Sequence, residues 1–498
     1  MSRGTGREEE FVYNAGSYDS PKGVYLNLIQ NGNGTWTVTQ PNGTNYEFNV
    51  AGVLTEISDR NGNAITFAYS ATPEAIYSYP LYPRTTPVTS ATVVGYEYQL
   101  TTITDTVGRD IDFTYNTDGK LDKITDYSGR EVSFSYDANT GDLLTITKPA
   151  TTQYPTGVTK TFEYDTNHNL ETITDAKSQT FVTNYFDSEG RVYQQDLGTG
   201  SFLFSYGVGE TTITDRNGYD ITFDYDGDAN MTSFEVFTDG LRVGEPASYI
   251  TTQTRDAEGN LASVTYPEGN GVKYVYDVTN TDRRARGNLL QVRQKADMAV
   301  ADDNNADLIT TITYESTYNQ IKTLTDPKGN VYTVTYDYEL NPIDPKYATK
   351  GNAVKVELPT VNSQTPTWEY TYNAYGQITE VEDPNGNITQ YTYHASTGYL
   401  NQVKRDPAGI NAVTTVTYDS IGNIDTITDG ESRVTDYDFN ELNWLIQVTN
   451  DLGYVTKLTH DKNGNVTKVE RQVNDAATAW QDVDFTYDIL NNLKTVTD

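Results

Sequence analysis

Residues 116–136 read NTDGKLDKITDYSGREVSFSY, and this stretch contains one complete structural unit. Apolar and polar residues alternate from Leu121 to Asp126 and again from Val132 to Tyr136, which is typical of strands with one buried face. The segment 127–129 connects these two stretches and ends in Gly129. Glycine adopts a positive φ without a steric clash, so this segment favours a tight turn. The stretch therefore predicts a two-stranded β-hairpin.

This unit recurs along nearly the whole chain as Y-[DN]-x-x-G-x-L-x-x-I-T-D-x-x-G-x-x-x-x-F-x-Y, and the closing Tyr opens the next copy. A spacing of 21 residues separates Tyr115 from Tyr136, Tyr164 from Tyr185, Tyr185 from Tyr206, and Tyr372 from Tyr393. Weaker or longer copies open at Tyr46, Tyr225, Arg255, Tyr276, Tyr314, Tyr336, Tyr418, Tyr437, His460 and Tyr487. The polar insertions 302–307 and 341–347 in the longer links indicate surface loops.

The repeat predicts an all-β fold. A single hairpin is marginal in water, so adjacent hairpins must pair edge to edge into one continuous antiparallel sheet. Long sheets twist and curl, so this one is expected to spiral. Periodicity alone leaves open whether the spiral is a solid solenoid or a hollow cocoon-type shell. We expect an irregular N-terminal lead over residues 1–20, a lead-in β segment with the first repeat over 21–70, and the repeat array over 71–498, which stops in mid repeat.

Two side-chain roles are predicted within each unit. The spacing F-x-Y places both rings on one face of a strand, where we expect them to stack along the array. The residue after the Tyr is often Asp, whose carboxylate accepts hydrogen bonds from backbone N–H groups and fixes the next turn. Examples are Asp137, Asp165, Asp277, Asp337 and Asp419.

Composition excludes several functions. The chain has 498 residues and a formal net charge of −34, a field that repels nucleic acid and anionic lipid surfaces. There is no Cys, so disulfides and thiolate sites are excluded, and with 36% hydrophobic residues the core is expected to be thin. No apolar run is long enough for a membrane span, and Met1 to Glu10 lacks the apolar middle of an export signal.

No residue is assigned a catalytic, cofactor-binding or metal-ligating role. The histidines His168, His394 and His460 lie in separate repeats without metal-site spacing; His168 is expected in a turn and His460 at a packing position. The segments 59–63, 383–387 and 461–465 each place oxygen ligands around a glycine, but they lack the spacing of a calcium loop and are interpreted as turns. The basic cluster Arg283 to Arg286 is interpreted as a loop or protease-sensitive tip, with acidic cargo as an alternative contact.

The pattern closely resembles the YD repeat of the rearrangement hotspot (Rhs) family, which includes bacterial polymorphic toxins, shell-forming components of insecticidal toxin complexes, and teneurins. The resemblance lies in Tyr136-Asp137 with Gly141, Ile124-Thr125-Asp126 with Gly129, and Tyr418-Asp419 with Gly422, and it spans roughly residue 20 to the end. The stretch 21–69 also resembles the lead-in of bacterial members. The resemblance implies a hollow β-cocoon whose wall sequesters a C-terminal toxin domain.

The chain departs from the bacterial pattern in one motif. Bacterial members usually close with paired D-P-x-G-L elements at a self-cleavage site, and the nearest segment here is Asp406 to Ile410, DPAGI. That segment is in phase with D-P-x-G at 326–329 and 383–386, so all three are interpreted as turns.

The sequence therefore predicts a non-enzymatic shell segment, secreted or at the cell surface, that encloses a toxin or effector lying outside this chain. Secretion machinery is a further expected partner, and no cofactor is expected. Two alternatives stay open: a teneurin-like adhesion module that binds a glycan or protein ligand, and a subunit that self-associates into an extracellular fibre.

Overall fold

The computed structural model describes residues 9–70, 74–78, 92–238, 242–303, 306–473 and 479–498, with backbone alone for 74–78 and 92–97. The early strands are β1 (Val12–Asn14), β2 (Ser17–Asp19), β3 (Asn27–Gln30), β4 (Trp36–Thr39), β5 (Asn45–Phe48), β6 (Leu54–Ser58), β7 (Ala64–Tyr69), β8 (Glu74–Ser78), β9 (Thr92–Glu97), β10 (Leu100–Thr104), β11 (Asp110–Tyr115), β12 (Leu121–Thr125), β13 (Glu131–Tyr136), β14 (Leu143–Lys148), β15 (Val158–Tyr164), β16 (Leu170–Thr174), β17 (Thr180–Phe186), β18 (Val192–Leu197), β19 (Gly200–Gly207), β20 (Glu210–Thr214), β21 (Asp220–Tyr225) and β22 (Met231–Phe237).

The remaining elements include two single-turn 3₁₀ helices, η1 (Arg283–Ala285) and η2 (Asp337–Glu339). The later strands are β23 (Ser248–Arg255), β24 (Leu261–Thr265), β25 (Gly271–Tyr276), β26 (Leu289–Lys295), β27 (Leu308–Tyr314), β28 (Ile321–Thr325), β29 (Val331–Tyr336), β30 (Ala353–Glu357), β31 (Thr367–Tyr372), β32 (Ile378–Glu382), β33 (Ile388–Tyr393), β34 (Leu400–Arg405), β35 (Ala412–Tyr418), β36 (Ile424–Thr428), β37 (Val434–Phe439), β38 (Leu445–Thr449), β39 (Val455–His460), β40 (Val466–Gln472), β41 (Trp480–Tyr487) and β42 (Leu493–Thr497).

Almost every strand pairs antiparallel with the next one along the chain, and β7 pairs with β10. The result is one 40-stranded sheet, with β8 and β9 forming a separate two-stranded sheet. The predicted all-β fold, a single continuous sheet of tandem hairpins, is confirmed. The expectation of an irregular lead needs correction, because β1 and β2 form a hairpin within residues 9–20; residues 1–8 lie outside the described part. A tight turn at Ala15 and Gly16, which both have a positive φ, joins these short strands.

The hairpin of residues 116–136 forms as the sequence predicts. Strands β12 and β13 pair with Ile124 opposite Val132 and Thr125 opposite Glu131, so apolar residues share one face. On β11 and β12, Phe113 lies opposite Ile124, which extends the same apolar row to the neighbouring strand. The opposite face carries Thr and Ser pairs; the Ser135 and Thr145 hydroxyls are 2.5 Å apart. Strand β13 therefore has one apolar face, with Val132, Phe134 and Tyr136, and one hydroxyl-rich face, with Ser133 and Ser135.

A common turn joins most strands, and Asp383 to Asn387 illustrates it. The Asp383 Oδ1 atom accepts hydrogen bonds from the backbone N–H groups of Asn385 (2.8 Å) and Asn387 (2.9 Å), and Oδ2 accepts one from the Asn387 side chain (2.8 Å). Gly386 has a φ of 82°, which its missing Cβ permits. Asp165 and Asp419 accept the same backbone bonds, so the predicted turn role of the Asp after the Tyr is confirmed there.

The opening tyrosine of each unit closes the open end of a hairpin. Tyr136, the last residue of β13, follows a register shift, and its hydroxyl donates a hydrogen bond to the Leu121 carbonyl at the start of β12 (2.9 Å). Eight more tyrosines make the equivalent bond at 2.6–3.2 Å: Tyr115, Tyr206, Tyr314, Tyr336, Tyr372, Tyr393, Tyr418 and Tyr487. We call this set the tyrosine ladder.

The expectation that F-x-Y rings stack along the array is wrong for most described units. Phe223 and Phe234 do contact each other, with ring centroids 6.3 Å apart. Elsewhere the rows next to the phenylalanines carry aliphatic residues, as Ile124 does beside Phe113, and the tyrosine rings turn toward strand ends. The polar hydroxyl explains this, because a half-buried phenol needs a hydrogen-bond partner that a second ring does not supply.

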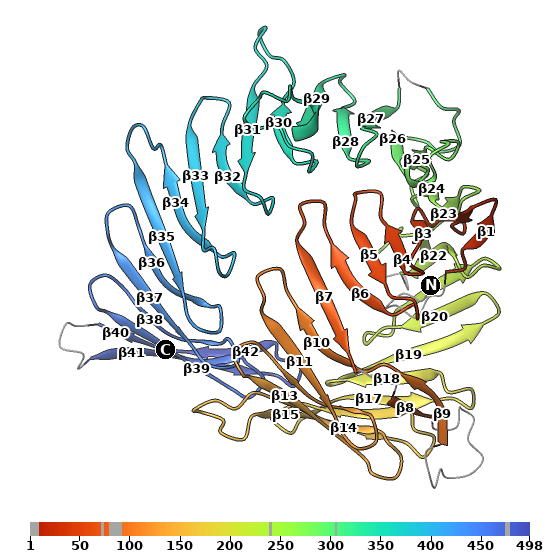
Figure 1. Ribbon diagram of the computed structural model, residues 1–498. Helices are drawn as coiled ribbons and strands as arrows, with labels where there is room; N and C mark the ends of the chain where they lie inside the picture. The colour runs from red at the N-terminus through yellow and green to blue at the C-terminus, as the bar shows by residue number, and fades with distance from the viewer. Residues whose placement is uncertain (1–8, 71–73, 79–91, 239–241, 304–305, 474–478) are drawn as a thin grey trace.

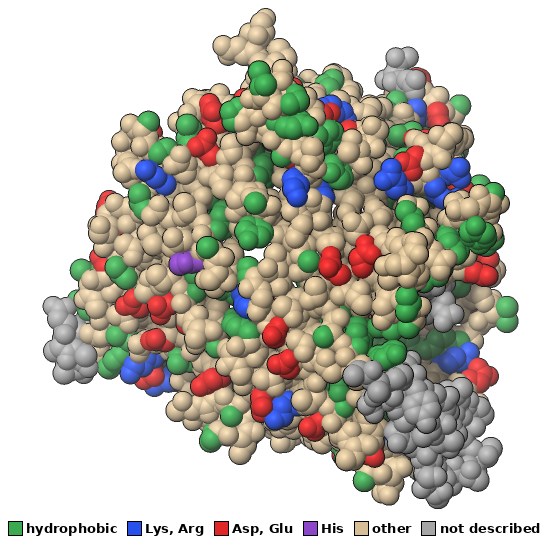
Figure 2. Space-filling view, in the orientation of Figure 1, with side chains coloured by type: hydrophobic (Ala, Val, Ile, Leu, Met, Phe, Trp, Pro, Cys, Tyr) green, Lys and Arg blue, Asp and Glu red, His purple; other side chains and the backbone are tan. Residues whose placement is uncertain are grey.

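The sheet is a single layer with few buried apolar side chains. Those in the described part are Val24, Val38, Val158, Val182, Tyr336, Val354 and Val416. On the face seen in Figure 2, uncharged polar atoms prevail and acidic and basic groups are scattered. The predicted thin core is confirmed, and cohesion depends on the strand ladder, the turns and the tyrosine ladder.

The sheet winds into a spiral that makes more than one full turn (Figure 1). We call residues 20–198 the first coil and residues 258–491 the second coil. Side chains of the first coil contact side chains of the second, as Arg283 contacts Ser20 and Tyr25 contacts Asn260. Hydrogen-bonded partners across this boundary are separated by 235 to 313 residues in sequence. The predicted spiral is therefore confirmed.

The two kinds of turn in the repeat lie on opposite edges of the spiral ribbon. Turns from an even-numbered strand to the next odd-numbered strand follow the I-T-D motif, and turns from odd to even follow the Tyr-Asp motif. Because the strands run across the ribbon, the two types are segregated to its two edges. As a result, I-T-D turns of the first coil meet Tyr-Asp turns of the second coil.

Raising the pH above 10 is expected to unfold the sheet. Burial raises the pKa of Tyr336 and of Tyr372 to about 12, and burial also raises the pKa of Tyr115, Tyr136, Tyr164, Tyr276, Tyr314, Tyr393 and Tyr418. Their stabilising contribution is complete below the ordinary value of 10.0 and is lost as the pH rises through the higher folded-state pKa. Circular dichroism between pH 9 and 12 should show this loss, and a constant spectrum to pH 12 would contradict it.

Candidate functional site

Contacts between the two coils form the most extensive interface in the described part of the chain, and we call it the coil seam. Its first-coil side consists of I-T-D turns and their equivalents, and its second-coil side of Tyr-Asp turns. The seam decides whether the spiral is a continuous wall or a loose ribbon. It is therefore the structural feature with the greatest consequence for function.

Arg109 is the centre of one seam cluster. Its guanidinium is paired with Asp105 in its own turn at 2.7 Å, and it donates a hydrogen bond to the Tyr399 hydroxyl of the second coil. It also lies over the rings of Tyr127 and Tyr399, at 5.2 Å and 5.0 Å from their centroids. Burial acts to raise the pKa of Asp105, but hydrogen bonds from Arg109 and from the Val107 N–H outweigh it and lower the pKa.

The next turn along the seam uses the same chemistry. The Tyr127 hydroxyl donates to the Ile421 carbonyl (2.7 Å), and Arg130 donates to the Asn443 side chain (2.6 Å). Burial and the neighbouring Tyr399 hydroxyl raise the pKa of Tyr127 to about 12. Arg130 is held in place by Asp126 at 2.6 Å, so the turn carboxylate positions the arginine that crosses the seam.

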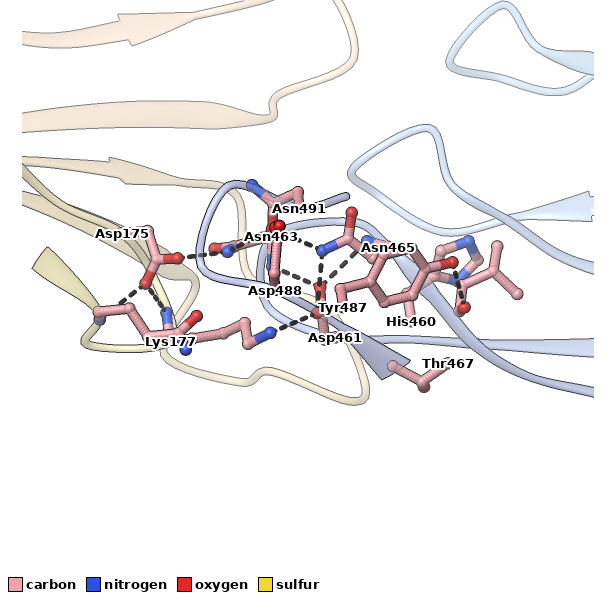
Figure 3. A network of polar contacts seen from close by, with 12 residues as sticks. Asp175, Lys177, His460, Asp461, Asn463, Asn465, Thr467, Tyr487, Asp488 and Asn491 are labelled. Atoms are coloured by element: carbon pink, nitrogen blue, oxygen red, sulfur yellow. Dashed lines mark hydrogen bonds and ion pairs between the residues drawn. The ribbon is translucent and has the colours of Figure 1, made fainter. Parts of the chain in front are cut away.

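A polar network continues the seam where β16–β17 meets β39–β42 (Figure 3). Lys177 of the first coil pairs with Asp461 at 3.0 Å, and the Asn463 side chain donates to Asp175. Asn463 and Asn465 both donate to the Asn491 side-chain oxygen, at 2.9 Å and 2.7 Å. Burial raises the pKa of Asp461, but bonds from Asn465 and Lys177 outweigh it, and the net pKa is lowered.

The structure confirms the predicted roles of two histidines. His460 is 6% exposed and stacks on Trp444 with ring centroids 5.3 Å apart, so it fills a packing position, and burial lowers its pKa. Its carbonyl also accepts a hydrogen bond from the Tyr154 hydroxyl across the seam (2.7 Å). His168 occupies a turn with a φ of 64° and lies 2.6 Å from Asp142. His394 contacts Tyr418 edge to face.

The basic cluster 283–286 lies in the loop between β25 and β26, as the loop interpretation expected, but it is half-buried, so the expectation of an exposed tip was wrong. Arg283 belongs to η1 and donates to the Ser20 hydroxyl and to the Pro21 carbonyl (2.6 Å). Arg284 pairs with Asp282 at 2.8 Å, and Arg286 donates to the Asn280 carbonyl at 2.7 Å. The cluster therefore ties the beginning of the first coil to the second coil, a long-range contact that no local pattern indicates.

The other segments singled out from the sequence are turns. Asp59 and Asp461 accept two backbone N–H bonds each within their own turns, as Asp383 does. Asp326 also forms the common turn, whereas Asp406 has a φ of 47° and accepts the Ile410 N–H through Oδ2. In the described residues no group of three or more acidic or histidine side chains is arranged to hold a metal ion.

The long links are loops, but one is more tightly bound than expected. Lys295, with a side chain only 1% exposed, lies 3.1 Å from Asp302 and 3.4 Å from Asp307, and Arg293 pairs with Asp307 at 2.7 Å. These ion pairs anchor the 302–307 insertion, of which residues 304–305 lie outside the described part. The insertion at 341–347 lies in an irregular segment, with Ile343 87% exposed.

Two clefts open along the seam. One of about 640 Å³ is lined by Arg109, Tyr393, His394 and Tyr399, and its neighbour of about 550 Å³ by Asn61, Lys350 and Tyr372. Both share Asn373 and Tyr375 of one Tyr-Asp turn. Sequence reasoning did not find these residues; only Arg109 carried a usable signal, because it directly follows the turn glycine Gly108. No helix in the described part is long and apolar enough to cross a membrane.

Comparisons with known proteins agree with this architecture. The sequence profile of the RHS Repeat family matches residues 372–410, and no curated protein sequence matches the chain. The crystal structure of TcdB2-TccC3 without its hypervariable C-terminal region superposes with a TM-score of 0.61 at 16% identity, covering 99% of this chain and 26% of that one. The TcdB2-TccC3 crystal structure gives a TM-score of 0.58 at 13% identity, covering 94% of this chain and 28% of that one.

A third structure, the Photorhabdus luminescens Tc holotoxin pore with a TccC3 mutation, gives a TM-score of 0.58 at 13% identity, with 94% of this chain and 27% of that chain covered. This chain thus spans about a quarter of the length of the structures that it matches. At these identities the likeness shows a shared fold, while the profile match identifies the repeat itself. The profile match identifies an RHS repeat at residues 372–410, and the shared fold agrees with an array of such repeats along the chain.

Proposed function

We propose that this chain is a non-enzymatic wall segment of a shell that encloses and sequesters a toxin or effector domain. The observation that carries the proposal is the coil seam, which joins successive turns of one sheet into a continuous wall. The fold match to TcdB2-TccC3 and to the Photorhabdus luminescens Tc holotoxin pore, which also contains TccC3, supports the same role. The cargo lies outside this chain, and the protein acts after secretion or at the cell surface.

The seam supports enclosure more than adhesion. An adhesion module needs exposed loops that recognise a ligand, whereas here arginines and tyrosines of the turns are used to bind the next coil. A wall needs this kind of lateral contact between each coil of the spiral and the next. In this proposal residues 21–70 form the lead-in and first repeat, and 71–498 form the wall.

Limited proteolysis of the natural protein that contains this array, together with its cargo, tests the proposal. We expect the cargo to resist trypsin while the shell is intact. In a seam variant that combines Arg109→Ala with Arg130→Ala, the cargo should be cleaved at least several times faster. The control combines Arg191→Ala with Arg433→Ala, which remove the same kind of Asp–Arg pair from turns that lie away from the seam. Equal cleavage of the cargo in wild type and in the isolated cargo would overturn the proposal.

A further inference from the structure

Three lysines surround a third cleft in the coil seam, close to the polar network of Figure 3. The cleft has a volume of about 300 Å³, and its lining includes Lys148, Lys160 and Lys462 together with the rings of Phe181 and Trp444. Lys148 and Lys160 belong to the first coil, whereas Lys462 and Trp444 belong to the second. The cleft therefore lies between the coils.

The strand register places two of these lysines on one face of the sheet. Lys148 pairs with Val158, and Ile146 pairs with Lys160, so the two lysines are diagonal neighbours on adjacent strands. Such diagonal positions are about 7–8 Å apart, within the reach of long side chains. Lys462 approaches from the Tyr-Asp turn that begins at Asp461. The three lysines, all solvent-exposed, thus line one small cleft from both coils.

These charges are not neutralised within the described part of the chain. Two other seam cations do have carboxylate partners: Lys177 pairs with Asp461 and Lys346 with Glu369. The described residues provide no ion pair for Lys148, Lys160 or Lys462. The one acidic residue of the lining, Asp175, accepts hydrogen bonds from Asn463 and from the N–H groups of residues 177 and 179. In a chain with a net charge of −34, a cleft with this charge balance is exceptional.

The walls of the cleft are held in position independently of any ligand. The Trp444 ring stacks on His460 and meets Tyr154 edge to face at 6.3 Å. Lys160 lies over the Phe181 ring at 5.5 Å from its centroid. A preformed concave site lined by aromatic rings and a few convergent charged groups is the usual form of a small-molecule site.

We propose that this cleft binds a small polyanion bearing phosphate or sulfate groups, which the three ammonium groups hold between the two coils. Tetrahedral oxyanions suit lysine because each ammonium donates charge-assisted hydrogen bonds without a fixed orientation. Binding removes the mutual repulsion of the lysines and connects the first coil to the second. The ligand therefore stabilises the closed wall.

Isothermal titration calorimetry on the whole chain at constant ionic strength tests this proposal, with pyrophosphate and a disulfated disaccharide as separate probes. We expect saturable binding of one or both probes, and the tighter one identifies a phosphate or a sulfate ester as the ligand class. Each of Lys148→Gln, Lys160→Gln and Lys462→Gln should weaken binding about tenfold, the effect of one charged hydrogen bond.

The matched control is Lys328→Gln, which removes an exposed lysine from a turn on the opposite edge of the second coil and should leave the affinity unchanged. Circular dichroism verifies that each variant is folded. The proposal is overturned if neither probe binds the wild type. It is equally overturned if a folded variant lacking all three lysines binds as tightly as wild type, or if Lys328→Gln weakens binding as much as the cleft variants do.

Discussion

Replacing Tyr336 with alanine is expected to destabilise the sheet by about 3–5 kcal/mol, the cost of removing a buried aromatic ring. Tyr336 is 4% exposed, which makes it the most buried tyrosine in the described part. Its hydroxyl donates to the Ile321 carbonyl at 2.6 Å, and its ring stacks on Tyr338 with centroids 6.1 Å apart. The substitution removes the ring contacts and leaves the open end of the β28–β29 hairpin untied.

Two controls separate the ring from the hydroxyl. Tyr336→Phe keeps the ring and removes the hydrogen bond, so a loss of about 1 kcal/mol is expected. Tyr225→Ala changes a tyrosine at the same repeat position that is 36% exposed, and a smaller loss than at Tyr336 is expected. Urea unfolding followed by circular dichroism measures all three. If Tyr336→Ala and Tyr225→Ala lower the urea midpoint of unfolding equally, the burial of the tyrosine ring does not determine the loss of stability.

The hairpins and their turns could be predicted from the sequence because they depend on residues that are close together in the chain. Alternation in residues 132–136 determines which side chains face the same way, and the glycine at 129 permits the reversal that brings Ile124 opposite Val132. Repetition of that unit then requires lateral pairing, which gives one sheet. These inferences need only neighbours in the chain, and the structure confirms them.

The partners of the tyrosine hydroxyls and the seam contacts could not be predicted. The bond from Tyr136 to the Leu121 carbonyl depends on a register shift that the alternation pattern does not reveal. The contact of Arg283 with Pro21 depends on how many strands complete one turn of the spiral. That number follows from twist and curl accumulated over many strands, so a small error per strand moves the partner by a whole repeat.

The same limit applies to the arginines that pair with the aspartate of their own turn. Arg109, Arg130, Arg191 and Arg433 each pair with the Asp four residues earlier, at 2.6–2.8 Å. The sequence gives all four the same local role. Only the spiral distinguishes them, because it brings the edge with Arg109 and Arg130 against the second coil.

Arg109→Ala is therefore expected to destabilise the protein by about 2 kcal/mol, whereas Arg191→Ala should have a much smaller effect. Arg109 lies over two tyrosine rings, which contribute about 0.5–1 kcal/mol each, and it also pairs with Asp105 and bonds to Tyr399. Arg191 pairs with the equivalent aspartate of its own turn, Asp187, and lies over one ring, that of Tyr206 at 4.6 Å, but among the described residues it makes no side-chain contact across the seam.

Hydrogen exchange distinguishes a seam effect from a turn effect in these variants. If Arg109 joins the coils, its loss should increase amide exchange in the turn at 105–109 and also in the turn at 394–399, about 290 residues away in sequence. Arg191→Ala should increase exchange only around its own turn. Faster exchange confined to residues 105–109 in Arg109→Ala would mean that the coils are held together without this arginine, and the seam would then depend on backbone carbonyl contacts such as the one from Tyr127 to Ile421.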